Sequence, residues 1–207
     1  MFETRPTKEN AKAFFDLYMS RKDKVLAEFI ARSEATGGPK TSELNYTKES
    51  LVPLWLWVRD KTPYAPMHPP LDLLPPWYSF ELITNPHSQK TCFTPEAAAN
   101  LDGLSYYFGD TLLRYVPDTE WGINPYLKGF DFAKPCVQSE FFNLYPIGMN
   151  IVLASVYIEM PQDIRINNNT LATALQQCID QEADYRAHYM KLGKHDDPST
   201  NRKAKFK

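Results

Sequence analysis

The chain has 207 residues, of which 43 % are hydrophobic and 14 % aromatic, so it has ample material for one sizeable core. Its formal net charge of −2 gives no electrostatic basis for general binding to nucleic acid or to an anionic membrane. No apolar run reaches the roughly 20 residues that a membrane span needs, and the N-terminus lacks the apolar core of a signal peptide. Three widely spaced cysteines suit a reducing compartment, so we expect a cytoplasmic protein with free thiols.

Three segments begin with the same helix-start signal, a threonine followed two positions later by glutamate. The threonine hydroxyl can accept a free backbone N–H, and the glutamate charge complements the positive end of the helix dipole. The signals are Thr7-Lys8-Glu9, Thr47-Lys48-Glu49 and Thr94-Pro95-Glu96. They predict helices over about residues 8–35, 48–61 and 95–116. The first ends at Gly37-Gly38-Pro39, a glycine stop followed by proline.

Residues 62–93 form a proline-dense segment in which large apolar side chains, Trp77 among them, alternate with the prolines. A disordered linker is poor in such side chains. We therefore expect an ordered loop that lies against the body of the protein. The alternative is a partner-binding surface or an active-site lid, since long ordered loops are often functional.

The helix expected over residues 95–116 has an apolar face and a polar edge. The edge is an i, i+4 ladder of Asp102, Tyr106, Asp110 and Arg114. Two glycines, Gly103 and Gly109, each cost roughly 1 kcal/mol in a helix interior. Their presence predicts that another element approaches this helix closely.

The remaining segments complete the expected fold. Short strands are predicted at residues 120–123 and 135–144, and a long helix at 170–192. Residues 146–159 are compatible with a buried helix or a strand, and their length favours helix. Together these elements predict one helix-dominated α+β domain over residues 1–192, with a small antiparallel sheet and a polar, disordered tail at 193–207.

Two segments resemble a family of small, uncharacterised bacterial cytoplasmic proteins. Residues 47–57 are similar to its S-L-x-x-L-W-x-W helix, and residues 106–114 followed by Trp121 are similar to its Y-x-G-E-x-x-x-R…W segment. Asp110 stands where that pattern usually has glutamate. The resemblance covers about residues 47–142 and implies a bacterial or phage source. It implies no activity, although some relatives look like immunity-type or toxin-associated proteins.

The best candidate site combines Asp110 and Arg114, one helical turn apart, with Trp121 just beyond the helix. These residues can present a charge pair and an aromatic wall to a ligand; the structural alternative is an intrahelical ion pair under an aromatic cover. We also predict Trp77 and Trp121 as contact residues, because large aromatics supply much of the energy of binding. The four histidines have no partner at metal-ligand spacing, and we expect neither a metal nor a cofactor.

Two functions follow as hypotheses. The first is a non-catalytic protein-interaction module, in its specific form an immunity-type protein that binds a toxin; an exposed aromatic patch with Trp57, Tyr64 or Trp77 would favour it. The second is a small hydrolase or transferase. Its acidic site would combine Asp102, Asp110, Arg114 and Glu120, and a pocket joining three of them would favour it. The sequence leaves the oligomeric state open.

Overall fold

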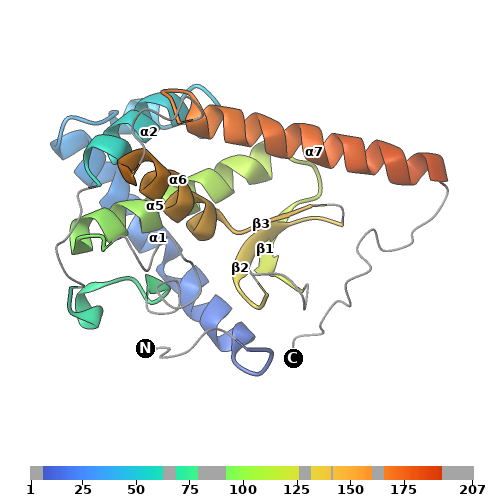
Figure 1. Cartoon of the computed structure of the whole chain (residues 1–207), viewed down its shortest axis with the longest axis horizontal. Helices are drawn as coiled ribbons and strands as arrows, with labels where there is room; N and C mark the ends of the chain where they lie inside the picture. The colour runs from blue at the N-terminus through green and yellow to red at the C-terminus, as the bar shows by residue number, and fades with distance from the viewer. Residues whose placement is uncertain are drawn as a thin grey trace.

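The computed structural model describes residues 7–62, 69–78, 92–125, 132–140, 142–159 and 166–192, and these residues form five α-helices and one small sheet (Figure 1). The helices are α1 (Ala11–Ala35), α2 (Leu51–Asp60), α5 (Pro95–Tyr115), α6 (Pro146–Glu159) and α7 (Thr170–Leu192). Two short 3-10 turns, η1 (Thr41–Glu43) and η2 (Leu71–Leu73), lie between them. This confirms the predicted helix-dominated α+β domain.

The sheet is antiparallel and has the order β1-β2-β3, with strands at Glu120–Ile123, Pro135–Gln138 and Asn143–Leu144. Trp121 faces Val137 in the first pair, and Val137 faces Leu144 in the second. The strand predicted over residues 135–144 is therefore two strands. A turn separates them, closed by a hydrogen bond from the Ser139 N–H to the Phe142 carbonyl.

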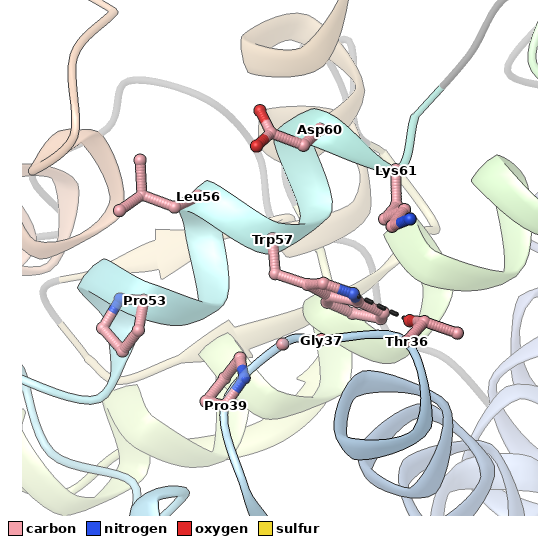
Figure 2. A pocket seen from close by; sticks show the side chains of 9 residues that line it. Thr36, Gly37, Pro39, Pro53, Leu56, Trp57, Asp60 and Lys61 are labelled. Carbon is pink, nitrogen blue, oxygen red and sulfur yellow. Dashed lines mark hydrogen bonds between the residues drawn. The ribbon is translucent and has the colours of Figure 1, made fainter.

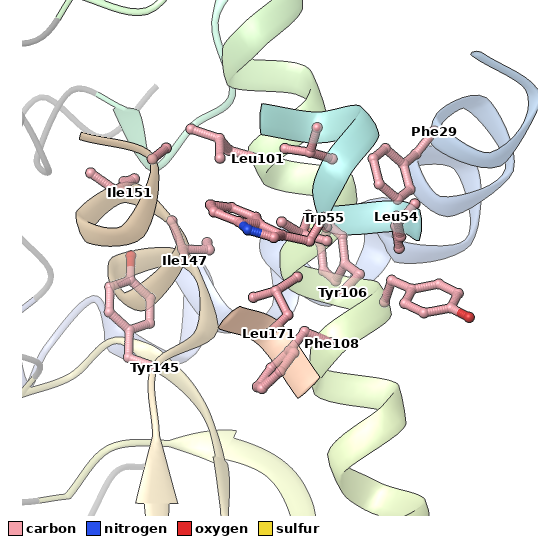
Figure 3. Close-up of a cluster of buried hydrophobic side chains, with 14 of the residues drawn as sticks. Phe29, Leu54, Trp55, Leu101, Tyr106, Phe108, Tyr145, Ile147, Ile151 and Leu171 are labelled. Carbon is pink, nitrogen blue, oxygen red and sulfur yellow. The ribbon is translucent and has the colours of Figure 1, made fainter. Parts of the chain in front are cut away.

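Helix α5 is the centre of the fold, and it contacts α1, α2, α6 and β2 (Figure 1). The predicted cap is confirmed, because the Thr94 hydroxyl accepts the Ala97 N–H and Pro95 occupies the first helical position. Fourteen of its 21 residues are buried, including polar ones. In Figure 3 the Trp55 ring of α2 lies among side chains of α5, α6 and α7 such as Leu101, Ile147 and Leu171.

The other two predicted caps are wrong. Helix α1 begins at Ala11, because Thr7 belongs to a preceding turn in which its N–H donates to the side chain of Asn10. Helix α2 begins at Leu51, and Thr47 accepts the Ser50 N–H across a turn that precedes the helix. The side chain that organises the local turn is therefore Asn10 before α1 and Thr47 before α2.

Residues 69–78, the longest described stretch of the proline-dense segment, pack against the body as predicted. Leu74, Trp77 and Tyr78 are buried, and the Tyr78 hydroxyl accepts the Phe93 N–H. Tyr64 and the tail at 193–207 lie outside the described residues.

Residues 146–159 are a helix, as their length favoured. Within the described residues, no helix is both long and apolar enough to cross a membrane.

Candidate functional site

Asp102 of α5 is a buried carboxylate with two partners from distant parts of the chain. Its Oδ1 accepts the indole N–H of Trp77 at 2.9 Å, and its Oδ2 lies 3.2 Å from a guanidinium nitrogen of Arg21 on α1. The side chain is 1 % exposed. Removal from water raises the pKa of Asp102 to about 6, and Arg21 and Trp77 oppose part of this rise.

Asp110 repeats this arrangement two helical turns later. Its carboxylate lies 2.7 Å from Lys22 Nζ of α1, and its Oδ1 accepts the indole N–H of Trp121 at 2.9 Å. Each of these two carboxylates thus joins one tryptophan to one cation of α1. The structure brings Asp110 and Trp121 together, as the sequence analysis predicted.

Two stacked tyrosines lie between the carboxylates. The rings of Tyr18 and Tyr106 are 4.4 Å apart, and the Tyr106 hydroxyl donates to the Tyr18 carbonyl at 2.7 Å. Burial raises the pKa of both phenols well above the ordinary tyrosine value. The two phenols are therefore neutral, and the α1–α5 seam is a packed structural layer.

The other residues of the predicted acidic site point elsewhere. Arg114 donates to the Asn45 carbonyl at 3.1 Å and lies over the Tyr46 ring at 4.3 Å, while Glu120 is exposed on β1. The predicted intrahelical pair of Asp110 and Arg114 is wrong, because Lys22 of α1 reaches Asp110 instead. Nothing in the described residues makes Asp102, Asp110, Arg114 and Glu120 converge on one pocket.

Trp77 is also corrected as a contact residue. Its side chain is 0 % exposed, and its only polar atom donates to buried Asp102. A partner cannot reach it in this structure. Trp121 is half-buried against Tyr18 and Tyr106. Trp77 therefore packs wholly within the domain, whereas Trp121 keeps part of its ring at the surface and stays a predicted contact residue.

Asp102 gives the domain a testable pH dependence. Because the folded protein holds this proton more tightly than the unfolded chain, the contribution of Asp102 to stability is largest below pH 4 and is lost as the pH rises to about 6. We expect that Asp102→Asn, which has no carboxyl group to titrate, does not lose this stability as the pH rises. Relative to the parent, the unfolding free energy of the variant should rise by about 2–3 kcal/mol between pH 4 and pH 7.

Urea denaturation at several pH values measures this difference. Asp16→Asn is the control, because Asp16 forms an exposed ion pair with Lys12 within α1. A difference between parent and Asp102→Asn that stays constant with pH would contradict the buried, proton-holding role of Asp102.

An open hollow of about 400 Å³ lies where the end of α1 meets α2 (Figure 2). The α1 side supplies the turn Thr36–Pro39, and the α2 side supplies one face of that helix. The lining residues of α2 and its end are Pro53, Leu56, Trp57, Asp60 and Lys61. Its volume is within the range of ligand sites, toward the smaller end.

The floor of this hollow is held rigidly. The Trp57 indole N–H donates to Thr36 Oγ1 at 3.0 Å, and the Ser33 hydroxyl donates to the Pro39 carbonyl at 3.0 Å. A Cβ at Gly38 would lie 2.6 Å from Trp57 Cγ, so only glycine lets the turn approach the ring this closely. Gly37 has φ +85°, which favours glycine and reverses the chain after α1.

The sequence predicted the helix stop at Gly37-Gly38-Pro39 but did not place α2 beside it. Trp57 was a candidate for an exposed aromatic patch, whereas the structure leaves it 6 % exposed and packs it in the core. Thr36, Pro53 and Leu56 were not predicted as lining residues. The double glycine was the available signal, because a second glycine after a helix stop indicates a close approach by another element.

Other chemistry is limited in the part of the chain that the structure describes. The cysteines Cys92, Cys136 and Cys178 form no disulfide, as predicted, and burial raises the pKa of Cys178 to about 11. No three His, Cys, Asp or Glu side chains of the described residues are grouped to hold a metal ion. His188 is exposed on α7, and the other histidines lie outside the described residues.

Function has to be argued from these residues themselves, because Asp110, Trp121 and the hollow carry no motif of a known reaction. The resemblance to the bacterial family remains a prediction from the sequence. A scan of protein-family models and searches of the curated proteins and of the solved structures found no match to this chain.

Proposed function

We propose that this chain is a non-catalytic protein-binding module and that its contact surface is the α1–α2 hollow. The observation that carries the proposal is a contrast between two places. Two of the three candidate catalytic carboxylates, Asp102 and Asp110, are each bound to an indole and a cation of the fold. The hollow is open, rigid and largely apolar.

Rigidity and an apolar lining favour non-catalytic binding of a partner. A pre-organised surface loses little conformational freedom when a partner docks, so more of the contact energy remains as affinity. Pro53 and Leu56 present apolar atoms. Trp57 is 6 % exposed and forms the floor beneath them, where its N–H is already used by Thr36. Such pockets commonly hold the anchor residues of a partner protein.

The immunity-type role, in which the partner is a toxin, is the specific form of this proposal that the family resemblance supports. It requires a stable, stoichiometric complex with a second protein. The enzyme alternative requires instead a turnover that depends on the carboxylate of Asp110.

Affinity capture with the tagged full chain, from an extract of its source organism, is the first step of the test. The captured protein is then purified and its dissociation constant measured by calorimetry. We expect Leu56→Arg to weaken this complex tenfold or more, because it places a charge in the apolar hollow, a loss of about 1.4 kcal/mol. The matched control is Leu17→Arg, an exposed leucine of α1 outside the hollow.

Both variants should melt close to the parent, which shows that the fold survives. Equal binding by Leu56→Arg and the parent would overturn the assignment of the surface. If no stoichiometric protein partner is found and a measurable turnover disappears in Asp110→Asn, the enzyme alternative replaces the binding module.

A further inference from the structure

Strand β1 lies at an edge of the sheet. The order β1-β2-β3 leaves β1 and β3 at the two edges. Strand β3 has only two residues, and α6 begins two positions after it, at Pro146. Strand β1 has four residues, so it offers the longer edge for a further strand.

The register of β1 and β2 shows which backbone groups point outward at this edge. Along an antiparallel pair, positions that exchange two hydrogen bonds alternate with positions that exchange none. Ile123 lies opposite Pro135, which has no N–H, so these two residues cannot exchange two bonds. The doubly bonded positions of β1 are therefore Glu120 and Gly122. The N–H and C=O groups of Trp121 and Ile123 point the other way, away from β2.

The pairing of β2 with β3 agrees with this alternation. The Ser139 N–H donates to the Phe142 carbonyl at 2.7 Å, so Ser139 is directed toward β3. Val137 lies two residues earlier and is directed to the same side, where it faces Leu144. The alternate residues of β2 are thus the ones that bond to β1, as the proline had indicated.

The outer side of β1 is open to a further strand. Within the described residues, no strand pairs with it, and the backbone groups of Trp121 and Ile123 have no hydrogen bond on that side. Gly122 and Ile123 are half-buried and Glu120 is exposed, so water reaches the strand. Proteins commonly block such edges with proline or lysine, and β1 contains neither.

We propose that the β1 edge pairs with the β1 edge of a second copy of this chain, antiparallel and about a two-fold axis at Gly122. Trp121 then exchanges two hydrogen bonds with Ile123 of the partner subunit, and Ile123 does so with Trp121 of the partner subunit. The glycines lie opposite each other, at a position where antiparallel Cα atoms approach to about 4.5 Å. Glu120 lies opposite Asn124 of the partner subunit, so no like charges meet.

The neighbouring registers are less favourable, which fixes the axis at the glycine. An axis at Ile123 would place Pro125, which has no N–H, opposite Trp121. An axis at Trp121 would pair Ile123 with Thr119, which precedes the strand. The edge is therefore complementary to itself, as the interface of a two-fold dimer has to be. This surface is separate from the α1–α2 hollow, so the inference does not rest on the proposed function.

Sedimentation equilibrium of the intact chain over a range of concentrations tests this proposal, and we expect a reversible monomer–dimer equilibrium. Ile123→Pro removes an outward N–H and leaves the bonds to β2 in place. Because of the two-fold symmetry it removes two of the four bonds between the copies, so the dissociation constant should rise about tenfold. Ile123→Val keeps the N–H and is the matched control. Leu56→Arg, in the hollow, should not change the dimer.

Amide hydrogen exchange measured by NMR gives a second readout that needs no variant. The amides of Trp121 and Ile123 should become protected only at concentrations at which the dimer forms, whereas those of Glu120 and Gly122 are protected at every concentration by β2. A chain that stays monomeric throughout, or a dimer in which the Trp121 and Ile123 amides still exchange freely, would refute the proposal. Protection of these amides by a captured partner protein, with the chain itself monomeric, would assign the edge to that protein instead.

Discussion

Trp77→Ala should destabilise the domain by about 3–5 kcal/mol, the usual loss when a large aromatic is removed from a core. The Trp77 side chain is fully buried, and its ring contacts Tyr78 with a centroid distance of 5.7 Å. The substitution leaves a cavity and also removes the N–H that Asp102 accepts. An unpartnered buried carboxylate oxygen adds its own cost, because it is not returned to water.

Two variants separate these causes. Trp77→Phe keeps most of the ring volume and removes only the donor, so it should cost about 1–3 kcal/mol. In the double variant Trp77→Phe, Asp102→Asn, the carboxylate that would lack its indole donor is replaced by a neutral amide. Its loss of unfolding free energy should therefore be smaller than the sum of the losses in the two single variants.

Urea denaturation followed by far-UV circular dichroism measures these values without relying on tryptophan emission. If Trp77→Ala melts like the parent and instead weakens partner capture, Trp77 is a contact residue and the buried position described above is wrong. A loss of stability with unchanged affinity per folded molecule is the result that the structure predicts.

The elements predicted best from the sequence are those whose signals are local. Helix α5 has its cap, its first-position proline and its apolar face within one segment, and its start was predicted at Pro95. Helix α7 and strand β1 likewise have the predicted bounds. These patterns report short-range preferences that the tertiary structure leaves unchanged.

The candidate site was predicted less well because its contacts join distant segments. The spacing of Asp110 and Arg114 is correct for an intrahelical pair, yet Lys22, which is 88 residues away, takes that place. Trp77 lies in a proline-dense segment that is typical of a surface loop, but its indole N–H meets a buried carboxylate of α5. Periodicity cannot predict such tertiary partners.

The two glycines of α5 are the case in which a local anomaly did predict a tertiary contact. A glycine inside a helix lowers the stability of the helix, and nothing in the local sequence compensates for it. In the structure, a Cβ at Gly103 would lie 2.4 Å from the Phe29 side chain, and one at Gly109 would lie 2.1 Å from Trp121 Cζ2. The predicted close approach is confirmed at both positions, and it is made by α1 and by β1.

Gly109→Leu should therefore destabilise the domain by about 1–3 kcal/mol or more, although leucine is the better helix former by most of 1 kcal/mol. Trp121 cannot move aside without cost. Its N–H donates to Asp110, and its ring contacts Tyr18 and Tyr106 at centroid distances of 5.9 and 6.2 Å. The added side chain has to displace Trp121 from this set or bend α5 away from β1.

A double-mutant cycle with Trp121→Ala identifies the clash as the cause. Trp121→Ala alone should be destabilising, because it removes the ring and its hydrogen bond to Asp110. In that background the space next to position 109 is empty, so adding Gly109→Leu should cost little or should stabilise the protein. The expected coupling is at least about 1 kcal/mol, the size found for residues in direct contact. Additive losses, measured by urea denaturation, would mean that Gly109 is required for some reason other than the approach of Trp121.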